Sequence, residues 1–233
     1  MDISIIIVNF KTDKLVSDCI SSIKKNTKLK YEIIVIDNSE DNKGFAIANN
    51  IGIRKAKGKY ILLLNSDTIV KPQAIDKLYD FAETTPNIGA VVPQLLNSDG
   101  SIQGSVFKLP TVLKAIRQYF FGENKLLDKY YPKEKTPVVV ESAVMAAFLI
   151  TPETLKKVGK LDEKYFMYFE DLDYCKRINE AGLKIYYLPE SEVIHIHGAS
   201  GGKNEKLIES SKKYHGILVY YIYTLVLWLG QKI

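Results

Sequence analysis

Cysteine is scarce in this sequence, and so are long apolar runs. Two cysteines, Cys19 and Cys175, stand among 233 residues, which is too few for a disulfide framework or a four-cysteine zinc site. We therefore expect both to be buried thiols in a reducing compartment. The longest largely apolar run, residues 217–229, has 13 residues, fewer than the roughly 20 that cross a bilayer. No basic leader precedes an apolar core at the start, so we expect a cytoplasmic chain.

A large excess of charge is also missing. The formal net charge is +5, and hydrophobic and charged residues make up 46% and 25% of the chain. These values are typical of globular proteins and argue against disorder or a polytopic membrane protein. A nucleic-acid-binding protein would usually carry a basic stripe, so no nucleic-acid partner is expected. Basic residues gather in 108–135 and 203–233, which suits anionic lipid or phosphorylated ligands.

The sequence does contain an alternation of strand and helix patterns. Residues 3–8, 32–36 and 60–64 are short apolar runs, and residues 12–26 and 45–57 between them carry apolar side chains at helical spacing. Strands that are apolar throughout and are joined by helices predict a sheet covered on both faces. We therefore expect an α/β protein with a doubly wound, mostly parallel mixed sheet of Rossmann-like type and a C-terminal helical appendage.

Beyond residue 70 the expected elements are less regular. Residues 97–137 contain several prolines and glycines and predict turns and irregular structure. The segment from about Glu205 predicts a helix that is apolar nearly all round, and such a helix is buried, packed on a second copy or laid in a membrane interface. The other expected elements are a helix from Pro72 to about Thr84, a strand at 88–92, a strand through 138–150, a helix opened by Pro152, a helix from about Glu170 to Gly182, and strands at 184–188 and 193–196.

Polar residues end each of the first three expected strands. They are Asn9, the pair Asp37-Asn38 and the triplet Asn65-Ser66-Asp67. Ligands of open α/β sheets bind outside the carboxyl ends of the strands, so these side chains can hold a nucleotide and a divalent metal on its phosphates. The alternative is that they begin turns. Three such strand ends in succession favour a site, and Asp67 is its strongest candidate.

Two groups of motifs resemble one known family. The first group lies in the first half of the sequence and contains 37–42, 44–46, Asn49, Asn50, Gly52 and 58–68. The second group lies in the second half and contains 166–173, Gly182 and 193–195. In this order and spacing they resemble inverting family two glycosyltransferases, in particular the rhamnosyltransferase-like members. The first group is similar to the nucleotide-sugar half of that family and the second to its acceptor half. The resemblance extends from Ile3 to about Ser200.

The resemblance implies a glycosyltransferase-A fold and a metal-dependent hexosyltransferase using Mg²⁺ or Mn²⁺. Its donor would be a nucleoside diphosphate sugar of the UDP or dTDP type, and its acceptor a glycan or lipid-linked saccharide of cell-surface polysaccharide synthesis. Rhamnose is the first guess for the sugar. Together with the strand-end argument, which supplies Asn9, the resemblance gives Asn9, Asp37, Asn42, Asn49, Asn65 and Asp67 as the expected nucleotide-sugar-binding residues. Asp37 would contact the base, Asn49 the nucleotide and Asp67 the metal, although the family's DxD motif here reads Asn65-Ser66-Asp67.

Glu170 and Asp171 open an expected helix next to several aromatic residues. A carboxylate within reach of an acceptor hydroxyl can take its proton, and aromatic neighbours raise its basicity. The alternative is that these are first-turn residues favoured by the helix dipole, like Asp173. With the resemblance, Asp171 becomes the expected catalytic base and Glu170 the residue that orients the acceptor.

His195 and His197 occupy alternate positions of an expected strand and so share one face. The resemblance places His195 at the family's terminal His position. The expected metal ligands are therefore Asp67 and His195, and His197 is kept as the alternative to the latter.

The sequence predicts a catalytic domain with a C-terminal helix, and two other functions compete with the transferase. Residues 1–202 would form the catalytic domain, with 1–97 as its nucleotide-sugar half and 98–202 as its acceptor half. Residues 203–233 would form an apolar helix that contacts the inner face of the cell membrane through 205–230 or builds a homo-oligomer. A sugar nucleotidyltransferase is one rival, but the glycine-rich loop that it normally needs is absent after the first strand. A catalytically silent, membrane-associated binding module is the other, suggested by the missing first carboxylate.

Overall fold

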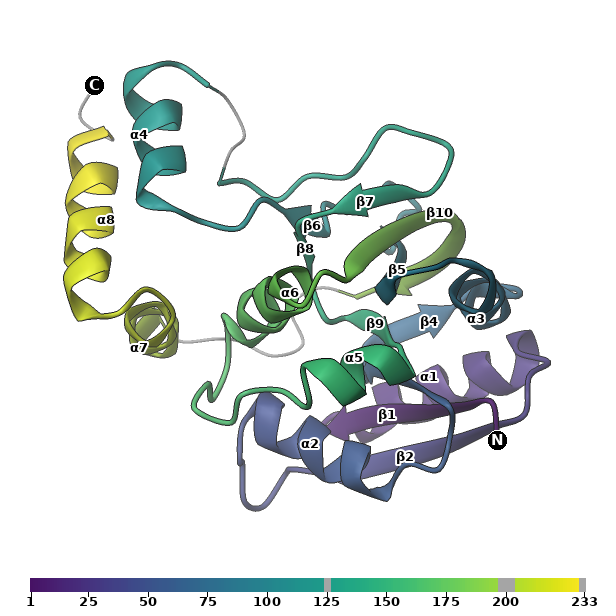
Figure 1. Ribbon diagram of the computed structural model, residues 1–233. Helices are drawn as coiled ribbons and strands as arrows, with labels where there is room; N and C mark the ends of the chain where they lie inside the picture. The colour runs from purple at the N-terminus through teal and green to yellow at the C-terminus, as the bar shows by residue number, and fades with distance from the viewer. Residues whose placement is uncertain (124–126, 197–203, 231–233) are drawn as a thin grey trace.

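The computed structural model describes residues 1–123, 127–196 and 204–230. Its centre is a mixed, mostly parallel sheet with the strand order β2-β1-β3-β9-β5-β10-β4, and β7 pairs with β10 (Figure 1). The strands are β1 Ile3–Asn9, β2 Tyr31–Asp37, β3 Tyr60–Asn65, β4 Thr68–Val70, β5 Ile88–Leu96, β7 Val138–Val140, β9 Ala147–Ile150 and β10 Lys184–His195. β1 runs parallel to β2 and β3, and β5 to β10, whereas β9 and β4 are antiparallel to their neighbours. The predicted fold class is confirmed.

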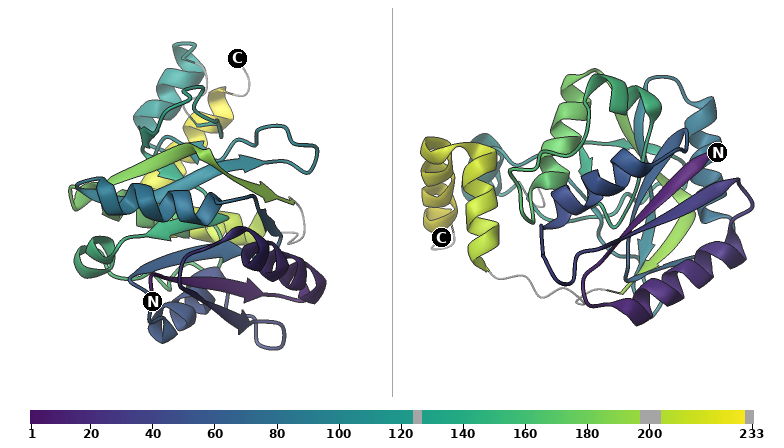
Figure 2. Two further views of the ribbon diagram at one scale, coloured as in Figure 1. Left: turned by 90° about the vertical axis from the view of Figure 1, so that its right-hand side faces the viewer. Right: turned by 90° about the horizontal axis from the view of Figure 1, so that it is seen from below.

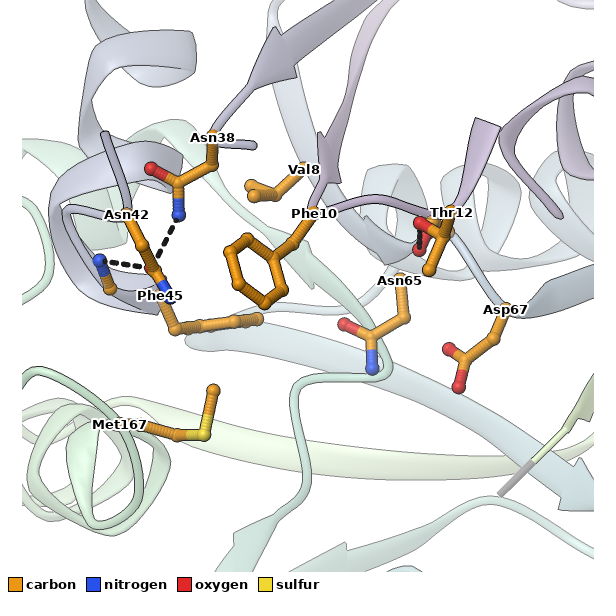
Figure 3. Close-up of a pocket in the computed structure, with 11 residues that line it drawn as sticks. Val8, Phe10, Thr12, Asn38, Asn42, Phe45, Asn65, Asp67 and Met167 are labelled. Carbon is orange, nitrogen blue, oxygen red and sulfur yellow. Dashed lines mark hydrogen bonds between the residues drawn. The ribbon is translucent and has the colours of Figure 1, made fainter. Parts of the chain in front are cut away.

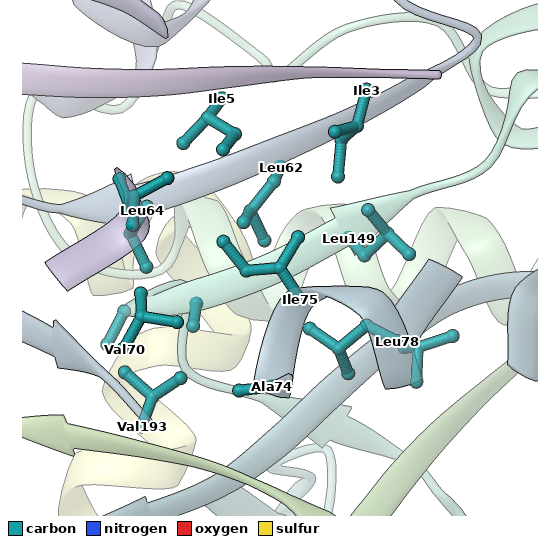
Figure 4. Packing of buried hydrophobic residues seen from close by; sticks show 14 of the residues in the cluster. Ile3, Ile5, Leu62, Leu64, Val70, Ala74, Ile75, Leu78, Leu149 and Val193 are labelled. Carbon is teal, nitrogen blue, oxygen red and sulfur yellow. The ribbon is translucent and has the colours of Figure 1, made fainter. Parts of the chain in front are cut away.

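Helices cover both faces of this sheet. On one face Ile3 and Leu62 pack with Ile75 and Leu78 (Figure 4); on the other, Ile6 packs among residues of α2 and α6. Alternate side chains of one strand thus enter two cores, which explains why the strands are apolar throughout. The helices are α1 Asp13–Asn26, α2 Phe45–Lys55, α3 Ala74–Thr84, α4 Val112–Phe120, α5 Pro152–Lys157, α6 Glu170–Glu180, α7 Asn204–His215 and α8 Ile217–Gly230. Cys19 and Cys175 are free and buried, as predicted.

Residues 97–137 are more regular than predicted. β6 (Val106–Phe107) pairs with β8 (Ser142–Ala143) in a small antiparallel sheet. α4 follows Thr111, whose hydroxyl accepts a hydrogen bond from Lys114 N at 3.2 Å. The prediction of irregular structure was wrong here. It gave weight to Pro110 and Gly122, which indicate turns at the two ends of the segment, and overlooked the threonine N-cap, which marks the start of a helix between them.

Three other boundaries also differ from the prediction. The strand expected over 138–150 is divided into β7, β8 and β9, and the strands expected at 184–188 and 193–196 are the single strand β10, with a register shift between Leu188 and Glu192. The C-terminal helix is two helices, because Gly216 has a φ of 77° and ends α7 in a left-handed turn. Within the described ranges no helix has the length and apolarity that crossing a membrane requires.

The topology gathers distant segments at one edge of the sheet. Because β1, β2 and β3 are parallel, Asn9 ends beside Asp37, and Val8 lies beside Asn65. β10 returns antiparallel to β4 and places His195 opposite Thr68. His195 therefore reaches the polar end of β3 from the far end of the sequence.

Candidate active site

A small cavity of about 100 Å³ opens at the carboxyl ends of β1, β2 and β3. Figure 3 shows Asn38 and Asn42 on one side, Asn65 and Asp67 on the other, and the ring of Phe10 between them. An aromatic face next to amide groups can both stack on a heterocycle and hydrogen-bond to it. This cavity is therefore suited to part of a nucleotide.

Three of the six expected nucleotide-sugar residues line this cavity, namely Asn42, Asn65 and Asp67. Asn42 also holds the loop before α2, because its Oδ1 accepts hydrogen bonds from Asn38 Nδ2 and Gly44 N, each at 3.0 Å. Asn42 thus shapes the cavity wall as well as lining it.

The other three expected residues, Asn9, Asp37 and Asn49, are not among the described residues that line this first cavity. Asn9 is buried, accepts from Thr12 N at 3.0 Å and donates to Asp13 at 2.6 Å, so it organises the start of α1. Asn49 donates to the Phe45 carbonyl at 2.9 Å within α2. Asp37 is exposed at the same sheet edge, and the hydroxyl and N–H groups of Ser39 lower its pKa. Its contact with a base stays a prediction.

A second cavity, of about 550 Å³, adjoins the first and shares Asn65 and Asp67 with it. His195 enters this cavity from β10, and its Nε2 lies 3.5 Å from Asp67 Oδ1. Asn65 Nδ2 lies 3.5 Å from the same nitrogen. The structure thus brings the two expected metal ligands together.

Gln103 fixes the orientation of the His195 ring. Its Nε2 donates to Asn97 Oδ1 at 2.9 Å and to the His195 carbonyl at 3.3 Å, so its Oε1 faces His195 Nδ1 at 2.8 Å. Because an amide oxygen can only accept, this network assigns a proton to Nδ1, and in the neutral ring the lone pair of Nε2 then lies on the side of Asp67. Sequence reasoning missed Gln103, which lies in the segment expected to be irregular.

The pair of Asp67 and His195 fits a divalent cation. A carboxylate oxygen and an imidazole lone pair that face each other at 3.5 Å are stabilised by a cation between them, and this donor set suits Mn²⁺. The described residues contain no cluster of three or more His, Cys, Asp or Glu side chains with such geometry, so a metal here would need further ligands from phosphate or water. His197, the alternative ligand, lies outside the described residues.

A third cavity, of about 400 Å³, contains Asp171 and adjoins the second. Lys129, Tyr168 and Glu170 line both of them. α6 begins at Glu170 directly after Tyr168 and Phe169, whose φ angles of 70° and 65° are left-handed. Residues other than glycine adopt this conformation rarely, and such strain gathers at functional sites.

Glu170 and Asp171 are both held toward the protonated form. Burial, followed by the neighbouring Asp171 charge, raises the pKa of Glu170 to about 8. Burial also raises the pKa of Asp171, against the opposing effects of the Leu172 N–H, which donates at 2.8 Å, and of the Lys129 charge. Among the described residues Glu170 Oε2 has no hydrogen-bond partner. A carboxyl of raised pKa on a cavity wall is suited to general base catalysis near neutral pH.

Asp173, in the same helical turn, behaves differently. It accepts hydrogen bonds from Arg177 Nε at 2.8 Å and from the Tyr165 hydroxyl at 3.3 Å. Its carboxylate is thus paired within the protein, while Glu170 and Asp171 face cavities. A purely structural role at the helix start therefore accounts for Asp173 better than for the other two.

Several lining residues were not foreseen from the sequence. Phe10, Thr12 and Met167 line the first cavity, and Lys129 lines the second and third. Phe10 directly follows the strand-end residue Asn9 and Thr12 lies three residues after it, so the strand-end rule could have found them. Lys129 carries no sequence signal that separates it from other lysines.

Comparison with solved structures and with a family model identifies the fold and the family. The chain superposes on GalNAc-T7, solved with UDP, GalNAc and Mn²⁺, with a TM-score of 0.68 and 18% identity, over 92% of this chain and 47% of that one. The protein therefore has the expected glycosyltransferase-A fold. Residues 33–211 match the model of the glycosyltransferase-like family 2, and the chain belongs to this family, which confirms the resemblance.

Two curated relatives carry rhamnosyltransferase names. One is the N-acetylglucosaminyl-diphospho-decaprenol L-rhamnosyltransferase of Mycobacterium tuberculosis, 29% identical over 62% of this chain and 49% of the relative. The other is rhamnosyltransferase WbbL of Escherichia coli, 30% identical over 65% of this chain and 60% of the relative. The chain thus spans about half the length of the mycobacterial relative.

Proposed function

We propose that this protein transfers a sugar from a nucleoside diphosphate donor to a saccharide acceptor with inversion at the anomeric carbon. The observation that supports this proposal most is that the three cavities adjoin one another and share lining residues. Asn65 and Asp67 line the first and second cavities, and Glu170 lines the second and third. A donor at the sheet edge and an acceptor at Asp171 would meet in the second cavity.

The donor would lie across the first two cavities, with its nucleoside near Phe10 and Asn42 and its diphosphate near Asp67. Asp67 and His195 would hold a divalent cation, which supplies charge neutralisation for the departing diphosphate. Gln103 keeps the His195 ring turned toward that position by its hydrogen bond to Nδ1. In this division residues 1–97 serve the donor and 98–202 serve mainly the acceptor.

Asp171 would act as the base and Glu170 would orient the acceptor. The acceptor oxygen attacks the anomeric carbon, the bond from that carbon to the diphosphate oxygen breaks, and the hydroxyl proton passes to the Asp171 carboxylate. Glu170 Oε2, unpartnered among the described residues, would hydrogen-bond to a second acceptor hydroxyl. Attack from the Asp171 side, opposite the departing diphosphate, gives inversion.

Rhamnose carried on dTDP is the proposed donor, and a glycan on a lipid diphosphate is the proposed acceptor of cell-surface polysaccharide synthesis. The names of the two relatives support the sugar, and the name of the mycobacterial one supports the lipid diphosphate. Lys108 and Lys129 on the wall of the third cavity add positive charge that suits a phosphate-bearing acceptor.

A panel of UDP and dTDP sugars, assayed for released nucleoside diphosphate with and without Mn²⁺, tests this proposal. We expect one donor to be turned over, dependent on metal, at a rate that rises when an acceptor is added. Absence of turnover with every donor, both with Mn²⁺ and with Mg²⁺, would contradict it.

A further inference from the structure

α4 and α8 expose an apolar surface at the margin of the molecule. It consists of Leu113 and Phe120 of α4, Phe121 after it, and Leu218, Leu225 and Trp228 of α8, and we call it the α4–α8 surface. Leu218 is 75% exposed, Phe121 74% and Leu113 63%. α8 has no charged residue and no buried one. An exposed apolar helix of this kind indicates a surface that binds a membrane or another protein.

The two helices lie side by side and together carry the exposed side chains of the α4–α8 surface. Figures 1 and 2 show α4 and α8 together at the end of the molecule opposite the β1–β2 edge. A Cβ on Gly230 would come within 2.4 Å of Tyr119 Cβ, so the glycine permits this close approach of α8 to α4. Within the described ranges several α8 side chains nevertheless stay exposed, among them Leu218 and Leu225.

We propose that the α4–α8 surface docks on an anionic lipid bilayer and lies flat in its interface. α8 has 14 residues and contains no charged side chain, which suits a helix that lies along the interface. Tyr221 and Trp228, which are 59% and 50% exposed, provide aromatic side chains that favour the headgroup region.

The charge around the surface favours anionic lipid over a second copy of this chain. Residues 108–123 and 204–230 contain six basic and three acidic residues, a net charge of +3. Neither α4 nor α8 contains an acidic residue. A twofold interface would place the same basic rim against itself, whereas anionic headgroups attract it.

Docking would also orient the acceptor cavity, an inference that rests on the proposed function. The cavity that contains Asp171 is lined by Leu207 of α7 and Tyr223 of α8. Through Tyr223 its wall thus includes α8, one of the two helices that would lie on the bilayer. A saccharide on a lipid diphosphate would then reach Asp171 while its lipid chain stays in the bilayer.

The intrinsic fluorescence of Trp228, the single tryptophan of the sequence, provides a direct probe of docking. We expect a blue shift when vesicles containing phosphatidylglycerol are added and quenching when their acyl chains are brominated, with a weaker response to pure phosphatidylcholine. Absence of both changes would refute the proposal. A blue shift that depends on protein concentration without vesicles, together with a dimer in light scattering, would replace it with self-association.

A matched pair of double variants tests which surface is responsible. Leu218→Glu with Leu225→Glu should weaken vesicle binding in flotation by roughly tenfold or more. Val35→Glu with Val139→Glu alters two exposed valines of β2 and β7 and should bind like the wild type. Equal binding by both double variants would overturn the assignment.

The assay of nucleoside diphosphate release without vesicles separates this inference from the proposed function. If nucleoside diphosphate is released but the protein does not bind vesicles, only the docking is refuted. If the protein binds vesicles but releases no nucleoside diphosphate, only the transferase activity is refuted.

Discussion

Asp67 and Glu170 are two buried carboxyl groups of the same cavity with different surroundings. Asp67 faces the His195 imidazole at 3.5 Å, whereas Glu170 lies beside a second carboxyl and, among the described residues, leaves Oε2 unpartnered. A buried polar atom without a partner lowers stability, and such a cost is retained where the group has a binding or catalytic role. This difference supports the proposal that Asp67 binds the cation and Glu170 the acceptor.

Replacing the expected base separates chemistry from binding. Asp171→Asn should lower the transfer rate by about 10² to 10⁴ while donor affinity, measured by calorimetry, stays near that of the wild type. In the wild type, the acid limb of the rate profile should lie above the ordinary aspartate pKa, because burial raises the pKa of Asp171. Asp173→Asn is the matched control, since Asp173 pairs with Arg177, and it should retain most activity. Similar losses in both variants would contradict the assignment.

Glu170→Gln should change the pH dependence of stability. Burial raises the pKa of Glu170 from 4.5 to about 8, so folding favours its protonated form. Its contribution is present below pH 4.5 and is lost as the pH rises through about 8. The free energy of unfolding of the variant relative to the wild type should therefore increase by at least about 1 kcal/mol from pH 5 to pH 8 in urea titrations.

Glu163→Gln is the control for this titration. Hydrogen bonding from Asn50 lowers the pKa of Glu163. The free energy of unfolding of Glu163→Gln relative to the wild type should therefore not increase between pH 5 and pH 8. A difference between Glu170→Gln and the wild type that is independent of pH would show that Glu170 is not held protonated.

At the scale of elements, the loop before α2 is joined to the segment before α6. Phe45 N donates to the Phe166 carbonyl at 2.8 Å, and Gly44, with φ 82° and ψ 176°, brings the two backbones together. This backbone conformation is essentially restricted to glycine. The contact couples the wall of the first cavity to the segment that leads to Glu170 and Asp171.

Gly44→Ala should disturb this junction. The added Cβ would lie 2.2 Å from the Phe166 oxygen, so we expect stability to fall by roughly 3 kcal/mol and nucleotide affinity to fall with it. Gly100→Ala also changes a glycine of positive φ, but a Cβ there meets nothing within 4 Å, and a loss of about 1 to 2 kcal/mol is expected. Denaturation and nucleotide titration of both variants measure the difference, and equal losses would contradict a role for the Phe166 contact.

At the scale of the whole molecule, the fold was more predictable than the site. β1, β2 and β3 and the helices between them follow from periodicity. β1 and β3 are buried along nearly their whole length, whereas most residues of the edge strand β2 are half-buried. Gln103 and Lys129 were missed because their importance comes from contacts with elements far away in the sequence. The position of Asn9 at a strand end and the family motif around Asn49 predict ligand contacts, and these contacts stay predictions. In the structure both side chains hydrogen-bond to neighbouring groups of the chain.

A crystal structure with Mn²⁺ and a nucleoside diphosphate tests most directly whether the three cavities form one transferase site. The account predicts an anomalous manganese peak within coordination distance of both Asp67 and His195, the base beside Phe10, and the diphosphate pointing along the second cavity toward Glu170. A nucleotide bound elsewhere, or a metal that contacts neither Asp67 nor His195, would contradict it.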